Sequence, residues 1–461
     1  MKSGTPGVLL AVVGAAVSAA AARGEPGEIV WQDVIVHAYA YGAWDGADAA
    51  PDGTVYWMNR GLRSYTQEGQ LRWVRETAGD KVTIGRDGAI YTTEYVNTRT
   101  AEDPFWVPHH ARMTRDNEIV WTLPLPQGCA WLESGPEVGP DGNIYGTCSG
   151  GYNAPGPAWS VHRDGWHRWR VPGFKTPSIN LNQFDDERGR FYVRAGQIPY
   201  PNAPFGGTGG LVAMDLDGNV EWRIASSRSD YVGIHQPTGG VVTMGYAFDA
   251  DGGVLWQYPE GSTTSGPDGA IYVYRGYHTL SKYSPDGEHL WTTEQFNAGT
   301  WVWRPVFSPD GSAFYITSHA GIGYPDTATL SQVQARRTSD GSLIWRYEFP
   351  RLADDILEVH PPAISPDGTR LYVAGYKRIA GHGHLWAFDT GFGAPPACGT
   401  SDFNGDGDAG TDQDIEAFFA CIGGDCCGAC FAGGSDFNGD GDAATDQDIE
   451  SFFRVLGGGA C

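Results

Sequence analysis

The chain has 461 residues, of which 41% are hydrophobic and 13% aromatic, with 66 glycines and a formal net charge of −24. This length can bury a large core, and abundant glycine with many aromatic residues favours short strands and tight turns over helices. The acidity argues against nucleic acid and anionic membranes as partners and favours divalent cations.

The N-terminus has the pattern of an export signal. Lys2 is followed by an unbroken run of apolar and small residues over positions 8–22. The run is short for a membrane anchor, which needs about 20 apolar residues. We therefore predict a signal peptide over residues 1–22, cleaved after about Ala20 or Ala22. The mature protein is expected to be secreted, periplasmic or at the cell surface, with no membrane span.

A short phrase then recurs along the chain: Pro-Asp-Gly, one residue, an apolar residue and Tyr. Clear copies occupy residues 51–56, 140–145 and 267–272, and degenerate copies lie near residues 86, 187, 237, 309 and 366. Seven of these eight copies precede a second turn, usually with Gly, and then a tryptophan a few residues later. These tryptophans are Trp73, Trp121, Trp169, Trp222, Trp256, Trp291 and Trp345.

Two hairpin turns in each unit of about 46 residues predict a four-stranded antiparallel sheet. Such a sheet cannot bury both faces alone, so stacking around an axis, with the tryptophan as a wedge, predicts a propeller. The eighth unit lacks its tryptophan, and Trp31 near the mature N-terminus supplies one. We predict an all-β, eight-bladed β-propeller over residues 27–392, closed by its N-terminal strand.

These repeats resemble the PQQ-like (quinoprotein-type) propeller family, whose blades carry the same Asp-Gly-x-x-x-Trp motif. The family includes quinone-dependent dehydrogenases and non-enzymatic outer-membrane assembly scaffolds. The dehydrogenases place a vicinal disulfide against the quinone, whereas Cys129 and Cys148, the only cysteines of the propeller region, are not adjacent. The resemblance therefore implies the fold, and we expect no PQQ cofactor.

Aligning the blades on the Pro-Asp-Gly turn places one set of residues on the innermost strands, around the channel. Aromatic and charged side chains there could form a pocket for a sugar or an aromatic ligand. Ordinary lining of the channel is the alternative, and we favour it. The candidate residues are Trp44, Asp45, Asp80, Lys81, Tyr231, Trp303, Arg304 and His360.

The C-terminal segment, residues 393–461, contains an acidic duplication with a spacing of 34 residues. In each copy, oxygen-bearing side chains stand at positions 1, 3 and 5 and Gly at position 6, which is the pattern of a calcium loop. A merely disordered acidic tail is the alternative, and the near-identity of the copies argues against it. The predicted ligands of two calcium ions are Asp402, Asn404, Asp406, Asp408, Asp412, Asp414, Asp436, Asn438, Asp440, Asp442, Asp446 and Asp448.

A short amphipathic helix is predicted after each loop. Ile415, Phe418 and Phe419 have helical spacing, and Ile449, Phe452 and Phe453 repeat it, so each helix is expected to carry one apolar stripe through which the two copies pack together. Six of the eight cysteines lie from residue 398 onward. In an exported chain they predict disulfides of unknown connectivity, and Cys129 and Cys148 are close enough in sequence to pair. Metal ligation by the cysteines at 421–430 is the weaker alternative.

The tail resembles the duplicated calcium loops of dockerin-type modules, a resemblance that implies calcium binding and an assembly role. Position 12 of each loop is Gln413 or Gln447, flanked by acidic residues, so the closing ligand stays open. The cysteines also depart from the dockerin pattern, and docking onto a cohesin-like partner does not follow.

We predict a secreted, non-catalytic binding or scaffold protein, whose tail attaches it to an extracellular protein or polysaccharide. No nucleophile motif or phosphate-binding loop is found, and no residue is assigned as catalytic. The alternatives are a polysaccharide-active lyase or hydrolase with a dockerin-like tail and, after it, a quinone-dependent oxidoreductase.

Overall fold

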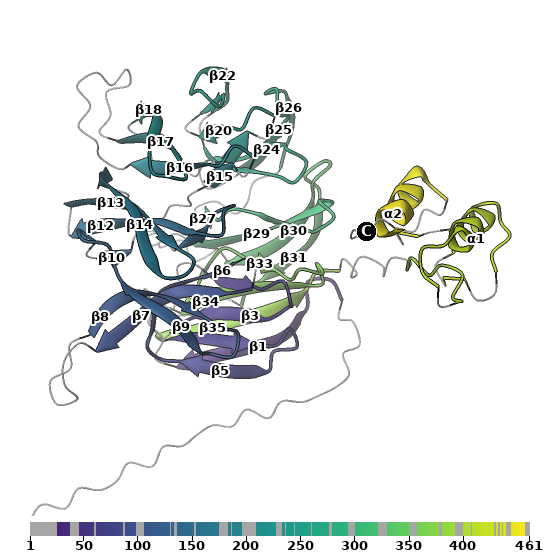
Figure 1. Ribbon diagram of the computed structural model, residues 1–461, viewed down its shortest axis with the longest axis horizontal. Helices are drawn as coiled ribbons and strands as arrows, with labels where there is room; N and C mark the ends of the chain where they lie inside the picture. The colour runs from purple at the N-terminus through teal and green to yellow at the C-terminus, as the bar shows by residue number, and fades with distance from the viewer. Residues whose placement is uncertain are drawn as a thin grey trace, which may run out of the picture.

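The structure is a computed structural model, and eight antiparallel sheets form its main body (Figure 1). The predicted signal peptide, residues 1–22, lies outside the described residues. The structure describes residues 25–36, 46–59, 61–85, 88–97, 106–129, 131–132, 136–151, 154–174, 183–185, 187–195, 209–226, 233–235, 237–243, 245–259, 261–275, 279–293, 300–320, 330–350, 357–377, 380–391, 400–406, 408–427, 430–431, 434–435, 437–438 and 444–456.

The first four blades follow one another along the chain, each running from an inner to an outer strand. Blade 1 comprises β2 (Ala47–Ala49), β3 (Val55–Met58), β4 (Leu62–Tyr65) and β5 (Leu71–Arg75). Blade 2 comprises β6 (Ala78–Ile84), β7 (Ile90–Asn97), β8 (Trp106–Met113) and β9 (Ile119–Pro124). Blade 3 comprises β10 (Trp131–Leu132), β11 (Glu137–Val138), β12 (Ile144–Gly151), β13 (Ala154–His162) and β14 (Trp166–Phe174). Blade 4 comprises β15 (Gln183–Asp185), β16 (Arg190–Ala195), β17 (Gly209–Asp215) and β18 (Val220–Ser226).

The next three blades repeat this order. Blade 5 comprises β19 (Gly233–His235), β20 (Gly240–Thr243), β21 (Tyr246–Phe248) and β22 (Val254–Gln257). Blade 6 comprises β23 (Ser262–Ser265), β24 (Ile271–Arg275), β25 (Thr279–Tyr283) and β26 (His289–Thr292). Blade 7 comprises β27 (Thr300–Val302), β28 (Val306–Phe307), β29 (Ala313–Ala320), β30 (Gln332–Arg337) and β31 (Leu343–Glu348).

Blade 8 combines both ends of the propeller sequence, as predicted. Its inner strands are β32 (Leu357–Val359), β33 (Ala363–Ile364), β34 (Arg370–Lys377) and β35 (His382–Asp389), and its outermost strand is β1 (Ile29–Val36). β1 pairs antiparallel with β35, so that Trp31 stands opposite Ala387 (Figure 1). Closure by the N-terminal strand covers the β35 edge, which would otherwise be open to pairing with another chain.

Eight indoles connect the blades around the ring, in agreement with the predicted role of the repeated tryptophan. Each donates its Nε1–H to a backbone carbonyl in a turn of the next blade, at 2.7–3.1 Å. The pairs are Trp31–Gln67, Trp73–Arg115, Trp121–Arg163, Trp169–Leu216, Trp222–Ala250, Trp256–Pro285, Trp291–Thr338 and Trp345–Thr390.

The indoles also lie against glycines of those turns. Gly218 has a φ of +87°, and a Cβ atom at this position would stand 2.7 Å from the Trp169 ring. Glycine is therefore required there twice, for the left-handed backbone and for the close approach of the indole. The same arrangement recurs at Gly165 under Trp121 and, across the closure, at Gly69 under Trp31.

The tail contains two helices, α1 (Asp412–Ile422) and α2 (Asp446–Leu456), drawn in yellow-green and yellow in Figure 1. Phe418 and Phe452 stack with their ring centroids 4.1 Å apart and form a core with other tail residues. The second ring of each stripe also meets its counterpart, with the centroids of Phe419 and Phe453 6.3 Å apart, but these two rings lie at the edge of the core and are 44% and 48% exposed. No described helix is long and apolar enough to cross a membrane.

Three disulfides are present among the described residues: Cys129–Cys148, Cys421–Cys426 and Cys427–Cys430. The first joins the connection between blades 2 and 3 to β12. The second joins α1 to the segment that follows it, and the third lies within that segment, so the adjacent Cys426 and Cys427 bond to different partners. The remaining cysteines, Cys398 and Cys461, lie outside the described residues.

Candidate functional site

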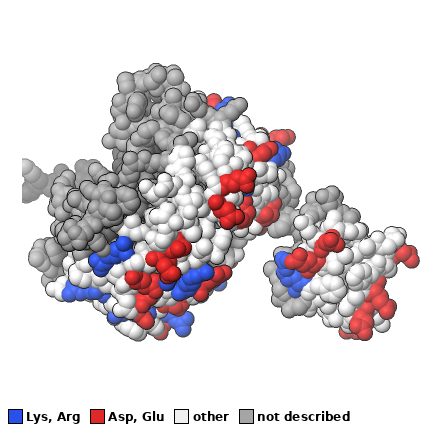
Figure 2. Space-filling view, turned by 90° about the horizontal axis from the view of Figure 1, so that it is seen from above, with Lys and Arg blue, Asp and Glu red and all other residues white. Residues whose placement is uncertain are grey.

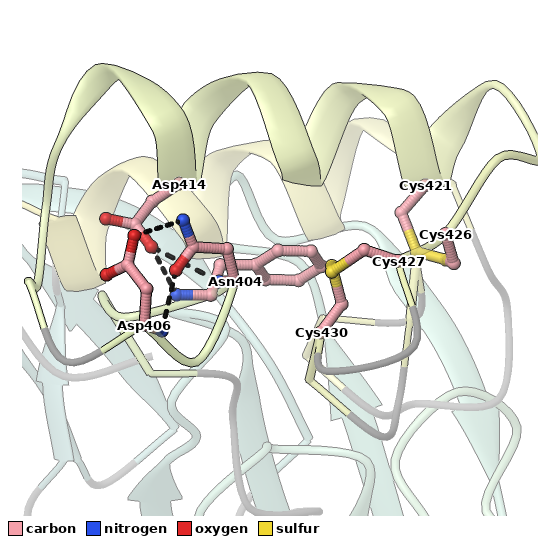
Figure 3. The surroundings of a disulfide bond; sticks show 8 residues. Asn404, Asp406, Asp414, Cys421, Cys426, Cys427 and Cys430 are labelled. Carbon is pink, nitrogen blue, oxygen red and sulfur yellow. Dashed lines mark hydrogen bonds between the residues drawn. A yellow bond between two sulfur atoms is a disulfide. The ribbon is translucent and has the colours of Figure 1, made fainter.

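The first acidic loop precedes α1 and turns sharply at Gly405, which has a φ of +73°. The backbone N–H of Asp406 donates to Asn404 Oδ1 at 2.9 Å, and that of Asp408 to Asp406 Oδ1 at 2.9 Å. The Asn404 amide also donates to Asp406 Oδ2 at 2.8 Å. Figure 3 shows the side chains of Asn404, Asp406 and Asp414 gathered at the start of α1.

Asp414 stands apart from the other acids of this loop because it is buried. Its Oδ1 accepts hydrogen bonds from the backbone N–H groups of Phe403, at 2.8 Å, and Asn404, at 3.2 Å. Its Oδ2 accepts from the backbone N–H of Thr411, at 2.8 Å, and from the Thr411 hydroxyl, at 2.9 Å. One carboxylate therefore joins the beginning of the loop to the residue that caps α1.

These contacts decide the charge of Asp414. Burial alone would raise its pKa, but the hydrogen bonds from the backbone N–H groups and the Thr411 hydroxyl outweigh burial and lower the pKa. A carboxylate that accepts several such bonds is stabilised in its ionised form. Asp414 is accordingly a buried anion whose charge is compensated by the protein.

The second loop repeats this arrangement where it is described. Asp448 is buried, accepts from the backbone N–H of Asn438 at 3.2 Å, and accepts at 2.8 Å from both the backbone N–H and the hydroxyl of Thr445. Asp446 is the exposed first residue of α2. The predicted ligands Asp436, Asp440 and Asp442 lie outside the described residues.

The remaining predicted ligands of the first loop are accessible. Asp406, Asp408 and Asp412 are exposed, whereas Asp402 and Asn404 are half-buried. Among the described residues, no three His, Cys, Asp or Glu side chains converge on one point in the way a bound ion requires. The donor set is nevertheless all oxygen and comes from alternate positions of a tight turn, the chemistry that calcium prefers.

The charge of the tail favours a cation. From residue 398 onward there are thirteen acidic residues and a single basic one, Arg454. Arg454 pairs with Glu450 on the same helix at 2.6 Å. Acidic groups are accordingly more numerous than basic ones on the face of the tail seen in Figure 2.

The structure describes only part of the predicted channel set. Trp303 and Arg304 lie between β27 and β28, and His360 directly follows β32. Asp80 and Lys81 lie within the innermost strand β6, and their side chains are outside the description. Trp44, Asp45 and Tyr231 also lie outside the described residues.

Trp303 links blade 7 to the inner strand β32 of blade 8. Its Nε1–H donates to the Val359 carbonyl at 2.5 Å, and its ring centroid is 5.9 Å from that of His319 and 6.1 Å from that of His360. His360 is 3% exposed, and neither ring nitrogen has a hydrogen-bond partner among the described residues. Burial lowers its pKa to about 3, so the imidazole is neutral.

Asp48 on β2 belongs to this region, although the sequence analysis did not select it. Burial raises its pKa, while backbone N–H groups and the charge of Arg304 act in the opposite direction. Asp48 pairs across the sheet with Tyr56, the tyrosine of the repeated phrase. The predicted channel residues, Trp44 apart, are the fifth and sixth before each Pro-Asp-Gly turn. The residue paired with the tyrosine of the repeated phrase lies closer to the turn, and in blade 1 it is Asp48.

Comparison with known proteins supports the fold alone. No family model matches the chain, and no curated protein matches it. Among solved structures, the quinohemoprotein alcohol dehydrogenase from Comamonas testosteroni is similar, with a TM-score of 0.52 and 13% identity over 86% of this chain and 82% of that one. Weaker likenesses are a chain of the mitotic checkpoint complex (TM-score 0.45, 11% identity, 82% and 98% covered) and the Dos1 propeller (TM-score 0.47, 12% identity, 78% and 95% covered).

The residues present do not fit a quinone site of the vicinal-disulfide kind. The two cysteines of the propeller region bond to each other across a separation of 19 residues, and the adjacent pair at 426–427 belongs to the tail. We therefore derive no quinone chemistry for this chain.

Proposed function

We propose that the tail binds two calcium ions and attaches an exported propeller to an extracellular protein or polysaccharide. The observation that carries this proposal is the pair of equivalent acidic sequences, each followed by its own short helix, with the two helices sharing one aromatic core. In the first loop, Asn404, Asp406 and Asp408 would supply oxygens to the ion. Calcium would neutralise part of the local charge and fix the turn around Gly405.

Calorimetric titration of the full chain with calcium tests this proposal. We expect two ions to bind, and Asp406→Asn to remove or strongly weaken one site, since it replaces a carboxylate that faces the loop. Asp425→Asn is the matched control, because it makes the same charge change at an exposed tail position outside both loops. Failure of the wild-type chain to bind calcium, or equal losses in the two variants, would contradict the proposal.

For the propeller we propose a non-catalytic role, in which it presents a ligand-binding surface near the channel. The support is the contact of Trp303 with His360 beside the inner strands of blades 7 and 8, next in sequence to the charged Arg304, and the lack of a hydrogen-bond partner for either His360 ring nitrogen among the described residues. A glycan array compared between the wild-type chain and Arg304→Ala tests it. Binding that is present in the wild type and lost in the variant is expected. A reducing-end assay on the same glycans, if positive, would instead favour a polysaccharide-active enzyme.

A further inference from the structure

The acids of the first loop fall into two groups that their spacing in the sequence does not separate. Asp406, Asp408 and Asp412 are exposed, whereas Asp414 is buried against the module core. Figure 3 shows Asp414 on the first turn of α1, above the loop that carries Asp406. The two groups therefore meet different surroundings before any ion is added.

The hydrogen bonds of Asp414 account for its whole accepting capacity. An ionised carboxylate has two oxygens with about four lone-pair sites in all. Phe403, Asn404 and Thr411 direct four donors at these oxygens, at 2.8–3.2 Å. A cation would have to displace at least one of these donors, and the N–H of Phe403, whose residue is buried, would lose its partner at a cost.

In the second copy, Asp448 has the same kind of contacts as Asp414. Asp448 occupies the equivalent place, is equally buried, and accepts from Asn438 and from both donors of Thr445. Thr411 and Thr445 are the residues directly before the two helices, so each carboxylate also satisfies an N–H at a helix start. Two copies with one contact pattern point to a shared role.

We propose that Asp414 and Asp448 are positioning residues that close the loops before calcium arrives, and that the ion takes its ligands from the exposed acids instead. Only the choice of calcium ligands rests on the proposed calcium binding. The closed loop is a property of the protein alone. Calcium would then bind a turn whose two ends are already held, which lowers the ordering cost of binding.

Hydrogen exchange of the full chain, read by mass spectrometry after calcium is removed with a chelator, tests the closure. We expect the amides of Phe403, Asn404 and Thr411 to stay protected in the wild-type chain. In Asp414→Asn they should exchange about tenfold faster or more, because an amide group cannot replace the acceptor capacity of a carboxylate. In the matched variants Asp406→Asn and Asp412→Asn, exchange in chelator should equal that of the wild type.

Calcium titration then separates the two roles. Asp406→Asn should reduce the number of ions bound or abolish binding at the first loop, whereas Asp414→Asn should keep two ions with a weaker first site. The wild-type experiment does not depend on whether Asp414→Asn folds. Unprotected Phe403, Asn404 and Thr411 amides in wild-type chain without calcium would overturn the inference, even if two ions bind. Absence of calcium binding with protected amides would overturn the proposed function and leave the loop closure standing.

Discussion

The propeller and the tail are both built by duplication, but they use it differently. The propeller repeats one contact eight times, an indole that bonds to a carbonyl of the next blade, and these contacts form a closed ring. The tail has two copies only, and each loop depends on one buried carboxylate, Asp414 or Asp448.

The difference indicates which contacts each part cannot lose without losing its structure. In the ring, each blade packs on two neighbours, so the one place without redundancy is the closure through β1. In the first loop, as far as the structure describes it, no other buried carboxylate can replace Asp414, and disulfides and aromatic stacking supply the stability that a large core would give. We therefore expect a bound ion to change the local structure of the tail and not that of the ring.

The largest effect is expected from opening the ring. Removal of residues 25–36 takes away β1 and Trp31 and leaves the edge of β35 unpaired. We expect loss of the cooperative unfolding transition and aggregation, measured by thermal denaturation and size-exclusion chromatography. Removal of residues 398–461 is the control, and it should leave the unfolding temperature of the propeller unchanged. A stable monomer without β1 would refute the closure.

A smaller effect is expected from a single methyl group under one indole. Gly218→Ala and Gly88→Ala both place alanine at a positive φ, which costs about 1 kcal/mol. A Cβ at Gly88 meets nothing within 4 Å, whereas one at Gly218 would stand 2.7 Å from the Trp169 ring. We expect Gly218→Ala to lose roughly 1–3 kcal/mol more stability than Gly88→Ala, as is usual where a core is overpacked. Equal losses on chemical denaturation would show that the indole does not hold the turn.

The smallest effect is expected from acid, and it belongs to the propeller. Burial lowers the pKa of His110 and of His360 to about 3, below the ordinary value near 6.5. Their contribution to stability is complete above pH 6.5 and decreases as the pH falls toward 3, since the unfolded chain takes up the protons. Each of these histidines should lower the free energy of unfolding by roughly 1 kcal/mol per pH unit below about pH 6. Denaturant titrations at pH 7 and pH 5 measure the free energy of unfolding at each pH. His360→Leu should reduce the difference between the two values. Equal stability at the two pH values would contradict the burial of neutral imidazoles.

Much of the fold could be predicted because its signals are local and repeated. The turn phrases and the tryptophan that follows the second turn identify the blades, and the last unit, which has no tryptophan after Gly391, identifies Trp31 as the replacement. The glycine under each indole was predicted only as a turn residue. Its second role depends on a contact between blades: Trp169 and its acceptor Leu216, for example, are 47 residues apart.

The site was less predictable, for a related reason. Asp412 and Asp414 are two residues apart and chemically identical, yet one is exposed and the other accepts four hydrogen bonds. Their spacing gave no indication of which acid would close the loop, because the donors come from Phe403 and Thr411 on either side of the turn. Likewise, helical spacing placed Phe419 beside Phe418 in the stripe but did not indicate where the core ends.

Limited proteolysis of the full chain, with calcium and with a chelator, tests most directly whether the ion acts on the tail alone. The account predicts that chelation produces new cleavages only within residues 400–456, near the exposed turn at 404–410, while the propeller over residues 25–391 gives the same fragments in both conditions. Chelator-dependent cleavage between propeller blades, or a tail whose cleavage does not depend on calcium, would contradict it.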